Sequence, residues 1–438
     1  MSTLSIMGAK LSSSLLSLIG RGGSMPGTIA LKVDPDSLKK LKFNGPVILV
    51  TGTNGKTSTA NMISSLFEQA GKKVVTNRKG DNLKAGITAA LLKSAKLNGT
   101  VDADVAVLEV DELNIRHVLP YLPVSALVVS NFFRDQLDRA KEMEQLIESI
   151  ESVLGDYTGT LILNGNDPNT VRLAYKAPKA DAMYFGIDRN RYSKETTTEA
   201  SEGKFCPICS GRLEYDYYQY SHIGSFHCTH CDFKTPALDV SLENIDLNDQ
   251  TFDCDGHHFT GPYEGMYSMY NYAAVLCAAK KFGVPFEVFD KMAKHAPKPA
   301  GRNEKFEKNG KTAILNLIKN PTGANEVLKV IERDDRRKAI VIVLNDREQD
   351  GCDVSWIYDT KFEKLMTDTT ASVICSGLRA GDMALRMDYG GYTGVMKLDS
   401  SIESAISSAL NDADVVYAIA TYTALLDTRR ALEKEIAA

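Results

Sequence analysis

The stretch Val50-Thr-Gly-Thr-Asn-Gly-Lys-Thr-Ser58 decides the fold of the chain around it. An apolar run, Pro46–Thr51, leads into this Gly-rich loop, and apolar residues at helical spacing follow it over Thr59–Ala70. Strand, Gly-rich loop, Lys-Thr and helix are together the context that a phosphate-binding loop requires. The general pattern places a Gly five residues before Gly55, where this chain has Val50. The stretch therefore predicts a nucleoside-triphosphate site of a particular subtype.

In such a loop, backbone N–H groups and the positive end of the helix surround the phosphates. We expect Lys56 to reach the outer phosphates and the Thr57 hydroxyl to bind Mg²⁺. The plainer alternative is an ordinary strand-to-helix turn with a capping Thr, and the complete context counts against it. The residues expected to bind ATP here are Thr53, Asn54, Gly55, Lys56, Thr57 and Ser58.

Length and composition limit what the chain can be. Its 438 residues suffice for two or three domains, and it is 43% hydrophobic and 24% charged, with a net charge of −5. This acidic balance gives no reason to expect nucleic acid as a partner. No apolar run approaches the ~20 residues of a bilayer-spanning helix, and no secretory signal is visible. We therefore expect a cytoplasmic protein whose eight cysteines are metal ligands or buried thiols.

Residues 1–45 precede the first predicted strand and are expected to form an N-terminal helical segment. Residues 1–24 place Leu4, Leu11 and Leu15 on one side of a helix. Such a helix could make peripheral contact with a membrane surface or pack on the protein's own body. Packing on the protein is the favoured interpretation.

From residue 46 the pattern alternates between strands and helices, which implies a parallel sheet with helices on both faces. Ligands bind such sheets at the carboxyl ends of the strands. Glu109 ends a strand predicted over residues 105–110, where its carboxylate could bind Mg²⁺ or simply be solvated. Asp135 and Asp138 follow the next strand and share a helical face, so they could support metal or nucleotide, or cap a helix.

Two cysteine pairs mark a later stretch. Cys206-Pro-Ile-Cys209 and Cys228-Thr-His-Cys231 are C-x₂-C knuckles eighteen residues apart, a strong signal of a tetrahedral Zn²⁺ site. Four thiolates leave no open coordination position, so we expect structural zinc in an insertion at about residues 204–235. Many Tyr and few Lys or Arg weaken a nucleic-acid interpretation of this ribbon. The nearby histidines, expected to be structural or exposed, are His222, His227 and His230.

A Pro/Gly-rich stretch at residues 298–303 looks like a domain boundary. We expect a nucleotide-binding domain over residues 46–300 and a Rossmann-like α/β domain over residues 301–438. Near the end of the first domain, Asn271 could face a nucleotide base or cap its own helix. In the second domain, the polar loop 345–359 follows a strand, and a functional loop and a solvated acidic loop are equal alternatives.

The chain resembles the Mur ligase family, the ATP-dependent amide-forming enzymes of peptidoglycan assembly. The Gly-rich loop is similar to that family's P-loop, the missing first Gly included, and Glu109 matches its Mg²⁺-binding glutamate. Asn131 to Asp138 resembles a family segment in which a His stands where this chain has Gln136. The resemblance implies three further ATP contacts: Asn271 near adenine, Arg302 on phosphate, and Asn316, which replaces the usual Asp, near the ribose.

The resemblance implies a P-loop-containing Mur ligase central domain with a Cys₄ zinc-ribbon insertion, followed by a C-terminal Rossmann-like α/β domain. Fewer than fifty residues precede the P-loop, where ordinary members carry a whole nucleotide-sugar domain, and the Cys₄ insertion is foreign to them. With the loop Asp350-Gly-Cys-Asp-Val-Ser-Trp-Ile-Tyr358, these features resemble one branch of the family. That branch forms the synthetase subunit of lipid II isoglutaminyl synthase and works with the glutaminase GatD.

This resemblance also implies a reaction. ATP activates the α-carboxyl of D-glutamate in the lipid II stem peptide as an acyl phosphate, and ammonia then gives D-isoglutamine. Lys56, together with Arg302 and with Mg²⁺ on Thr57 and Glu109, would neutralise charge on the transferring phosphoryl group. The expected cofactors are therefore ATP, Mg²⁺ and structural Zn²⁺.

The ammonia is implied to come from the partner, because this chain shows no glutaminase nucleophile of its own. Asp353 is implied to complete the partner's Cys-His triad by orienting its His, with Asp350 as the alternative. Two rival functions are a stand-alone Mur- or folylpolyglutamate-type amino-acid ligase and a zinc-ribbon NTPase that binds nucleic acid. A requirement for an amino acid would identify the first, and salt-sensitive binding of DNA or RNA the second.

Overall fold

The computed structural model describes residues 24–77, 81–133, 143–197, 203–296, 301–308 and 310–437. The chain divides into two compact units, the first holding the described residues up to 296 and the second those from 301 onward. Almost all of the helix expected over residues 1–24 lies outside the described residues, as do Asp135, Gln136 and Asp138. In the part of the chain that the structure describes, no helix is long and apolar enough to cross a membrane.

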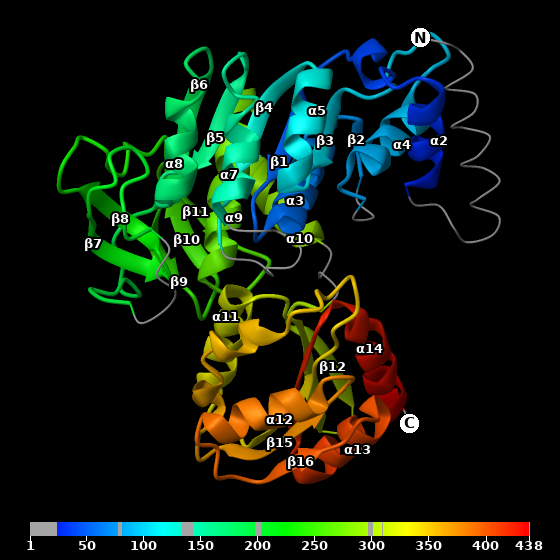
Figure 1. The fold of residues 1–438 in the computed structure, drawn as a ribbon, viewed down its shortest axis with the longest axis vertical. Coiled ribbons are helices and arrows are strands. Elements are labelled where there is room, and N and C mark those ends of the chain that lie inside the picture. Colours follow the sequence, from blue (N-terminus) through cyan, green and yellow to red (C-terminus); the bar gives the residue numbers. More distant parts are fainter. Residues whose placement is uncertain are drawn as a thin grey trace. The chain divides into compact units, whose positions relative to one another are not determined.

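The first unit is built on a nine-stranded sheet. Its strands are β1 (Val47–Thr51), β2 (Val74–Thr76), β3 (Val105–Glu109), β4 (Val124–Val129), β5 (Thr160–Asn164), β6 (Asp181–Ile187), β9 (Val240–Asp246), β10 (Thr251–Cys254) and β11 (His257–Thr260). They lie in the order β11-β10-β9-β6-β5-β4-β1-β3-β2, and the pairs from β9 to β2 are parallel. Because β1 lies between β4 and β3, the loop that follows it emerges inside the sheet and not at an edge (Figure 1).

Helices cover both faces of this sheet (Figure 1). They are α2 (Met25–Val33), α3 (Lys56–Gln69), α4 (Lys84–Ser94), α5 (Ile115–Val118), α7 (Met143–Glu151), α8 (Pro168–Tyr175), α9 (Met266–Phe282) and α10 (Glu287–His295). Ile48 and Val50 of β1 join a core with α3, α9 and α10, whereas Val47 and Leu49 join a core with α2, α4, α5 and α7. Burial on both faces explains the continuous apolar run of β1.

Between β6 and β9 the chain forms a two-stranded antiparallel hairpin of β7 (Leu213–Tyr220) and β8 (Ile223–Cys228). The strand β7 lies between the two cysteine knuckles. Leu213, Phe226 and Phe233 form a small core with Cys206 and Cys228. The same cluster includes Val171 of α8, so this end of the insertion packs on the body of the first unit.

The second unit has a six-stranded sheet in the order β12-β13-β17-β14-β15-β16. Its elements are β12 (Glu304–Lys308), β13 (Lys311–Leu317), α11 (Pro321–Glu332), β14 (Lys338–Val343), η4 (Ser355–Tyr358), η5 (Phe362–Leu365), β15 (Thr370–Ser376), α12 (Ala380–Tyr389), β16 (Met396–Leu398), α13 (Ile402–Asp412), β17 (Val415–Ala420) and α14 (Tyr422–Ala437). All pairs are parallel except β12 with β13. Separate cores on the two faces confirm the expected α/β layering.

Among the strands that the structure describes, six were not predicted, namely β8, β9, β10, β11, β12 and β16. Both β12 and β16 lie at sheet edges, and β12 carries four charged residues in five, so neither shows the apolar run of a central strand. The strands β10 and β11 extend the first sheet in antiparallel fashion and are only four residues long. The strands whose residues are all buried, such as β1, β3 and β14, are among those that the sequence reveals.

Candidate nucleotide and metal sites

The Gly-rich loop (residues 52–55) joins β1 to α3 at the carboxyl end of the parallel strands. Gly52 has φ +123° and Gly55 has φ +85°, conformations that residues with a Cβ rarely adopt. A Cβ on Gly55 would lie 2.3 Å from Oδ1 of Asn271, and a Cβ on Gly52 would lie 2.3 Å from Oγ of Ser130. Both glycines are therefore required by backbone conformation and by close neighbours.

Residues that follow β4 hold this loop in place. The Asn54 N–H donates to Oδ1 of Asn131 at 2.9 Å, and Nδ2 of Asn131 donates to the Asn54 carbonyl at 3.0 Å. Ser130 Oγ donates to the same carbonyl at 2.7 Å, and the Thr53 N–H donates to the Asn131 carbonyl at 2.9 Å. Bonds from a neighbouring strand end thus fix the backbone before α3, and Ser58 is buried in the first turn of that helix.

Thr57 and Glu109 meet at the site expected for Mg²⁺. The Thr57 hydroxyl donates to Oε1 of Glu109 at 3.0 Å. Neighbouring ligands of an octahedral Mg²⁺ lie about 3 Å apart when each bond is ~2.1 Å, so this oxygen pair fits the ion. Asn77 fixes the Glu109 backbone by pairing with its N–H at 2.9 Å and its carbonyl at 2.8 Å. The two oxygens are therefore placed where one hard cation could bind both.

Lys56 forms an ion pair with Glu112 that no pattern in the sequence predicts. Its ammonium lies 3.0 and 3.1 Å from the two carboxylate oxygens of Glu112, and the side chains are only 11% and 7% exposed. Glu112 follows Glu109 by three residues, and its acidic character was the only available signal. The pair places the lysine beside the Gly-rich loop, where its charge can meet phosphate.

Asn271 lies in the second turn of α9 and is 4% exposed. Its Oδ1 accepts a hydrogen bond from the Thr59 hydroxyl of α3 at 3.2 Å and stands next to Gly55. The side chain therefore contacts the Gly-rich loop and its helix and does not cap α9. The first unit thus brings together Lys56, Thr57, Glu109 and Asn271.

Arg302 and Asn316 belong to the second unit, where hydrogen bonds join the stretches that carry them. The Asn303 N–H donates to Oδ1 of Asn316 at 2.9 Å, and the Leu317 N–H donates to the Gly301 carbonyl at 2.7 Å. Asn316 is 3% exposed, and among the described residues its Nδ2 has no hydrogen-bond partner. A buried donor without a partner is costly, and a polar ligand could satisfy it.

The two aspartates of the loop after β14 differ in environment. Asp350 is 3% exposed, and its carboxylate accepts the Thr423 N–H at 2.7 Å and the Thr423 hydroxyl at the start of α14. Asp353 is partly exposed and accepts the Ser355 N–H at 2.8 Å. Bonds from the Ser355 backbone and side chain lower the pKa of the Asp353 carboxyl.

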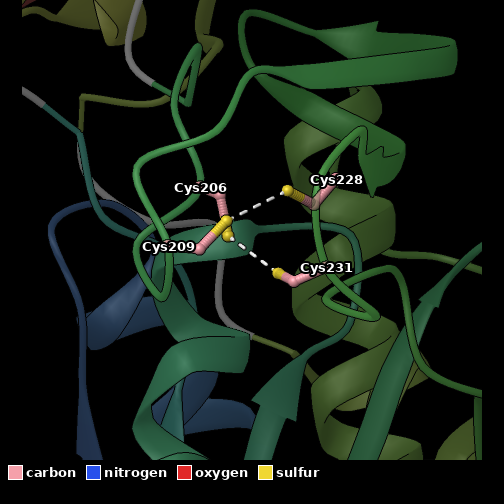
Figure 2. Close-up of side chains that lie close together, drawn as sticks. All are labelled: Cys206, Cys209, Cys228 and Cys231. Atoms are coloured by element: carbon pink, nitrogen blue, oxygen red, sulfur yellow. Dashed lines mark hydrogen bonds between the residues drawn. The ribbon is translucent and has the colours of Figure 1, made fainter.

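The four cysteines of the insertion converge on one point (Figure 2). The Sγ atoms of Cys206 and Cys231 are 3.7 Å apart, those of Cys209 and Cys228 are 3.5 Å apart, and all four lie within 4.8 Å of one another. Sulfurs bound at ~2.3 Å to a tetrahedral Zn²⁺ lie about 3.8 Å apart, whereas disulfide sulfurs lie ~2.05 Å apart. The cluster therefore fits one tetrahedral zinc ion.

Backbone N–H groups also form hydrogen bonds with the sulfurs of this cluster. N–H groups of Ile208, Gly211 and His230 donate to cysteine sulfurs at 3.3 to 3.4 Å. A backbone N–H lowers the pKa of the Cys231 thiol, but burial and bonds with the three neighbouring thiols outweigh it and raise this pKa to about 12. Burial raises the pKa of the Cys228 thiol, but backbone N–H groups and neighbouring thiols outweigh it and lower this pKa to about 6. Such bonds stabilise thiolate, the form that binds metal.

The three histidines near the cysteines occupy different environments. His227 and His230 are exposed, whereas His222, at the tip of the hairpin, is 1% exposed. Nε2 of His222 lies 3.3 Å from Oδ1 of the fully buried Asp167. The sequence expectation of structural or exposed histidines holds, but nothing in the sequence shows that His222 meets Asp167.

Two models of known protein families match this chain. The model of the Mur ligase middle domain matches residues 50–279, and the model of the MurT ligase C-terminal domain matches residues 317–425. A lipid II isoglutaminyl synthase (glutamine-hydrolyzing) subunit MurT of Staphylococcus aureus (strain COL) is 33% identical over 92% of this chain and 91% of that protein. The subunit of that name in Streptococcus pneumoniae (strain ATCC BAA-255 / R6) is 32% identical over 98% and 96%.

Solved structures agree on the fold. A pseudomurein peptide ligase type C from Methanothermus fervidus gives a TM-score of 0.69 at 20% identity, covering 91% of this chain and 80% of that one. MurF from Acinetobacter baumannii gives a TM-score of 0.66 at 16% identity, covering 92% and 78%. Identities this low establish the Mur ligase fold alone.

The Lys56–Glu112 pair predicts separate effects on activity and stability. Lys56→Met should lower ATP-dependent turnover roughly a hundred- to a thousandfold, because the cation that meets the phosphates is lost. It should also lower the free energy of unfolding by about 3 kcal/mol or more, because Glu112 stays buried without its lysine. Adding Glu112→Gln should recover most of the stability and none of the activity, as measured by thermal melting and ATP turnover. Full turnover by Lys56→Met would contradict the assignment.

The cysteine cluster predicts one zinc ion per chain by elemental analysis. Cys209→Ser should lose the zinc and expose the insertion to protease, because three thiolates and a hydroxyl bind zinc more weakly. Cys352→Ser, which replaces an exposed cysteine of the second unit, is the matched control and should keep full zinc content. A wild-type chain purified without zinc, and resistant to chelator in melting temperature, would refute the site.

Proposed function

The chain belongs to the MurT family of Mur-ligase-like synthetase subunits, and on that premise we propose the reaction that it carries out. It is a carbon–nitrogen ligase of peptidoglycan synthesis that uses glutamine as its nitrogen donor. Its proposed acceptor is the α-carboxyl of D-glutamate in the lipid II stem peptide, which becomes D-isoglutamine. A glutaminase subunit, GatD, is the proposed source of ammonia. With lipid II as acceptor, the chain would act at the cytoplasmic face of the membrane.

The observation that carries this proposal is the convergence of Lys56, Thr57 and Glu109 beside the Gly-rich loop. Amide formation from a carboxylate needs activation, because a carboxylate is a poor acyl donor. A loop that binds ATP and places a cation and a Mg²⁺ site at its outer phosphates supplies that activation. In a chain whose relatives are named glutamine-hydrolyzing synthase subunits, the same loop serves amidation.

The proposed reaction has two steps. A carboxylate oxygen of the acceptor attacks the γ-phosphorus of ATP, ADP leaves, and an acyl phosphate forms. Ammonia then attacks the acyl carbon and the C–O bond to phosphate breaks. The products are the amide and inorganic phosphate, which takes up the proton that ammonia loses. Lys56 neutralises charge on the transferring phosphoryl group, and the loop N–H groups hold the phosphates in line.

Thr57 and Glu109 are the proposed Mg²⁺ ligands, because their oxygens already have the spacing of neighbouring ligands. Bound there, the ion would supply positive charge to the phosphates. Asn271 is proposed to act near the base from its position beside Gly55. In the second unit, Arg302 is proposed to contact phosphate, and the unpartnered Nδ2 of Asn316 to contact the ribose.

Asp353 is proposed to orient the histidine of the glutaminase. A triad aspartate must be charged and able to reach the imidazole of another chain. Asp353 meets both conditions, because it is partly exposed and hydrogen bonds lower its pKa. Asp350 does not, because its carboxylate is buried against the start of α14. The environment of the two carboxylates thus favours Asp353.

We also propose the role of the zinc, the bounds of the domains and the kind of membrane contact. Zinc on the four cysteines is proposed to be structural, because four protein ligands leave no open position for a substrate. The proposed domains are an N-terminal segment over residues 1–45, an ATP-binding domain over 46–300 and a C-terminal domain over 301–438. Any membrane contact is proposed to be peripheral, made on the way to a lipid-linked acceptor.

The identity of the attacking nucleophile, ammonia or an amino acid, distinguishes the proposed function from its rival. The chain is mixed with its candidate glutaminase, ATP and lipid II, and the mass of the stem peptide is measured by mass spectrometry. Glutamine should give the mass change of carboxyl to amide, about 1 Da lower, and a panel of amino acids without glutamine should give none. A product heavier by a whole amino-acid residue would establish instead a stand-alone amino-acid ligase.

Asp353→Asn should separate the two nitrogen sources. Amidation with glutamine should fall roughly a thousandfold or more, because the partner's His loses the carboxylate that orients it. Amidation with added ammonia should stay near the wild-type rate, because the ATP site is untouched. Glu348→Gln, which removes an exposed acid of the same loop, is the control and should leave both rates unchanged. Equal loss of both activities in Asp353→Asn would exclude the triad role.

A further inference from the structure

The tip of the β7–β8 hairpin is buried, which is unusual for a hairpin turn. Tyr220, Ser221, His222 and Ile223 are 5%, 2%, 1% and 0% exposed. Turns normally lie in solvent, because burying their polar groups costs free energy. Ser221 even adopts a positive φ of 48° there. The body of the first unit must therefore hold this tip by specific contacts.

Those contacts involve Phe133 and Asp167. The His222 ring lies 4.8 Å from the Phe133 ring between centroids, and the Tyr220 ring stacks on Phe133 at 5.8 Å. Nε2 of His222 lies 3.3 Å from Oδ1 of Asp167, and both side chains are essentially inaccessible to solvent. Gly224, just past the tip, donates its N–H to the Asn166 carbonyl at 2.9 Å. The hairpin tip is thus packed on the residues that follow β4 and β5.

Phe133 also touches the Gly-rich loop. Its N–H donates to the Thr53 hydroxyl at 3.1 Å, and its carbonyl accepts from that hydroxyl at 3.3 Å. Asp167 contributes as well, because its Oδ2 accepts the Phe132 N–H at 2.9 Å. Phe133 therefore has the hairpin tip against its ring and the Gly-rich loop against its backbone, and it is completely buried between them.

We propose that His222 is a positioning residue of the ATP site, acting on the Gly-rich loop through Phe133 and Thr53. This proposal rests on the proposed function of that loop as an ATP site. Close-packed interiors respond to a lost ring by shifts of neighbouring groups into the space. A shift of Phe133 would move the hydroxyl of Thr53 and re-aim the loop's N–H groups, and small misplacements of such groups are costly. The inserted hairpin is then a part of the nucleotide site and not only a folded addition to it.

The test compares two histidines of the same hairpin. His222→Ala removes the buried ring, and His227→Ala removes an exposed ring of β8, with its side chain 46% exposed. The full-length variants are titrated calorimetrically with a non-hydrolysable ATP analogue and Mg²⁺, and their zinc content is measured. His222→Ala should raise the Kd about tenfold, one decade of affinity, with stoichiometry and zinc unchanged. His227→Ala should match the wild type.

A ring-retaining variant separates positioning from folding. His222→Phe keeps a flat ring against Phe133 and should keep the Kd within about threefold of the wild type. A merely structural role would lower the binding stoichiometry of His222→Ala, because part of the chain is unfolded, and leave its Kd unchanged. That result, or equal weakening by Phe and Ala, would overturn the proposal. No binding by the wild-type chain would overturn the ATP site itself.

Discussion

The hydrogen bonds between the Asn131 carboxamide and Asn54 are the constraint on which the rest of the nucleotide site depends. One side chain satisfies both the N–H and the carbonyl of the same loop residue, at 2.9 and 3.0 Å. The Gly-rich loop has no regular secondary structure of its own, so its conformation must come from outside. Asn131 follows β4, which pairs directly with β1, and strand pairing therefore sets the distance over which these bonds form.

Charge is placed around this loop in an ordered way. Glu109 faces the Thr57 hydroxyl, and Glu112 faces the Lys56 ammonium, so the acid that ends β3 and the acid three residues later have different partners. Both carboxylates are largely buried, at 6% and 5% exposure, which makes each dependent on its partner. A site that must accept a polyanion can carry these acids only if cations oppose them. In this structure Lys56 opposes Glu112.

The sequence predicted the parts of the molecule whose signal is local. The Gly-rich loop, the central strands and the two cysteine knuckles could be identified because a turn, an apolar run or a fixed spacing reveals each of them. Contacts between distant segments could not be identified in this way. Glu112 carries no mark of its partner Lys56, and His222 lies 55 residues from Asp167, with no pattern that joins them. Edge strands such as β12 were missed because charged residues interrupt them.

We propose that this chain transfers the γ-phosphoryl group of ATP directly to the acceptor carboxylate. The most direct measurement follows the oxygen of that carboxylate. An acceptor labelled with ¹⁸O in the D-glutamate α-carboxyl is amidated with ATP and ammonia, and the phosphate-containing products are analysed by mass spectrometry. An acyl phosphate predicts one ¹⁸O in inorganic phosphate for each amide formed, because the C–O bond breaks on the acyl side. Unlabelled phosphate, or ¹⁸O recovered in AMP, would contradict the account.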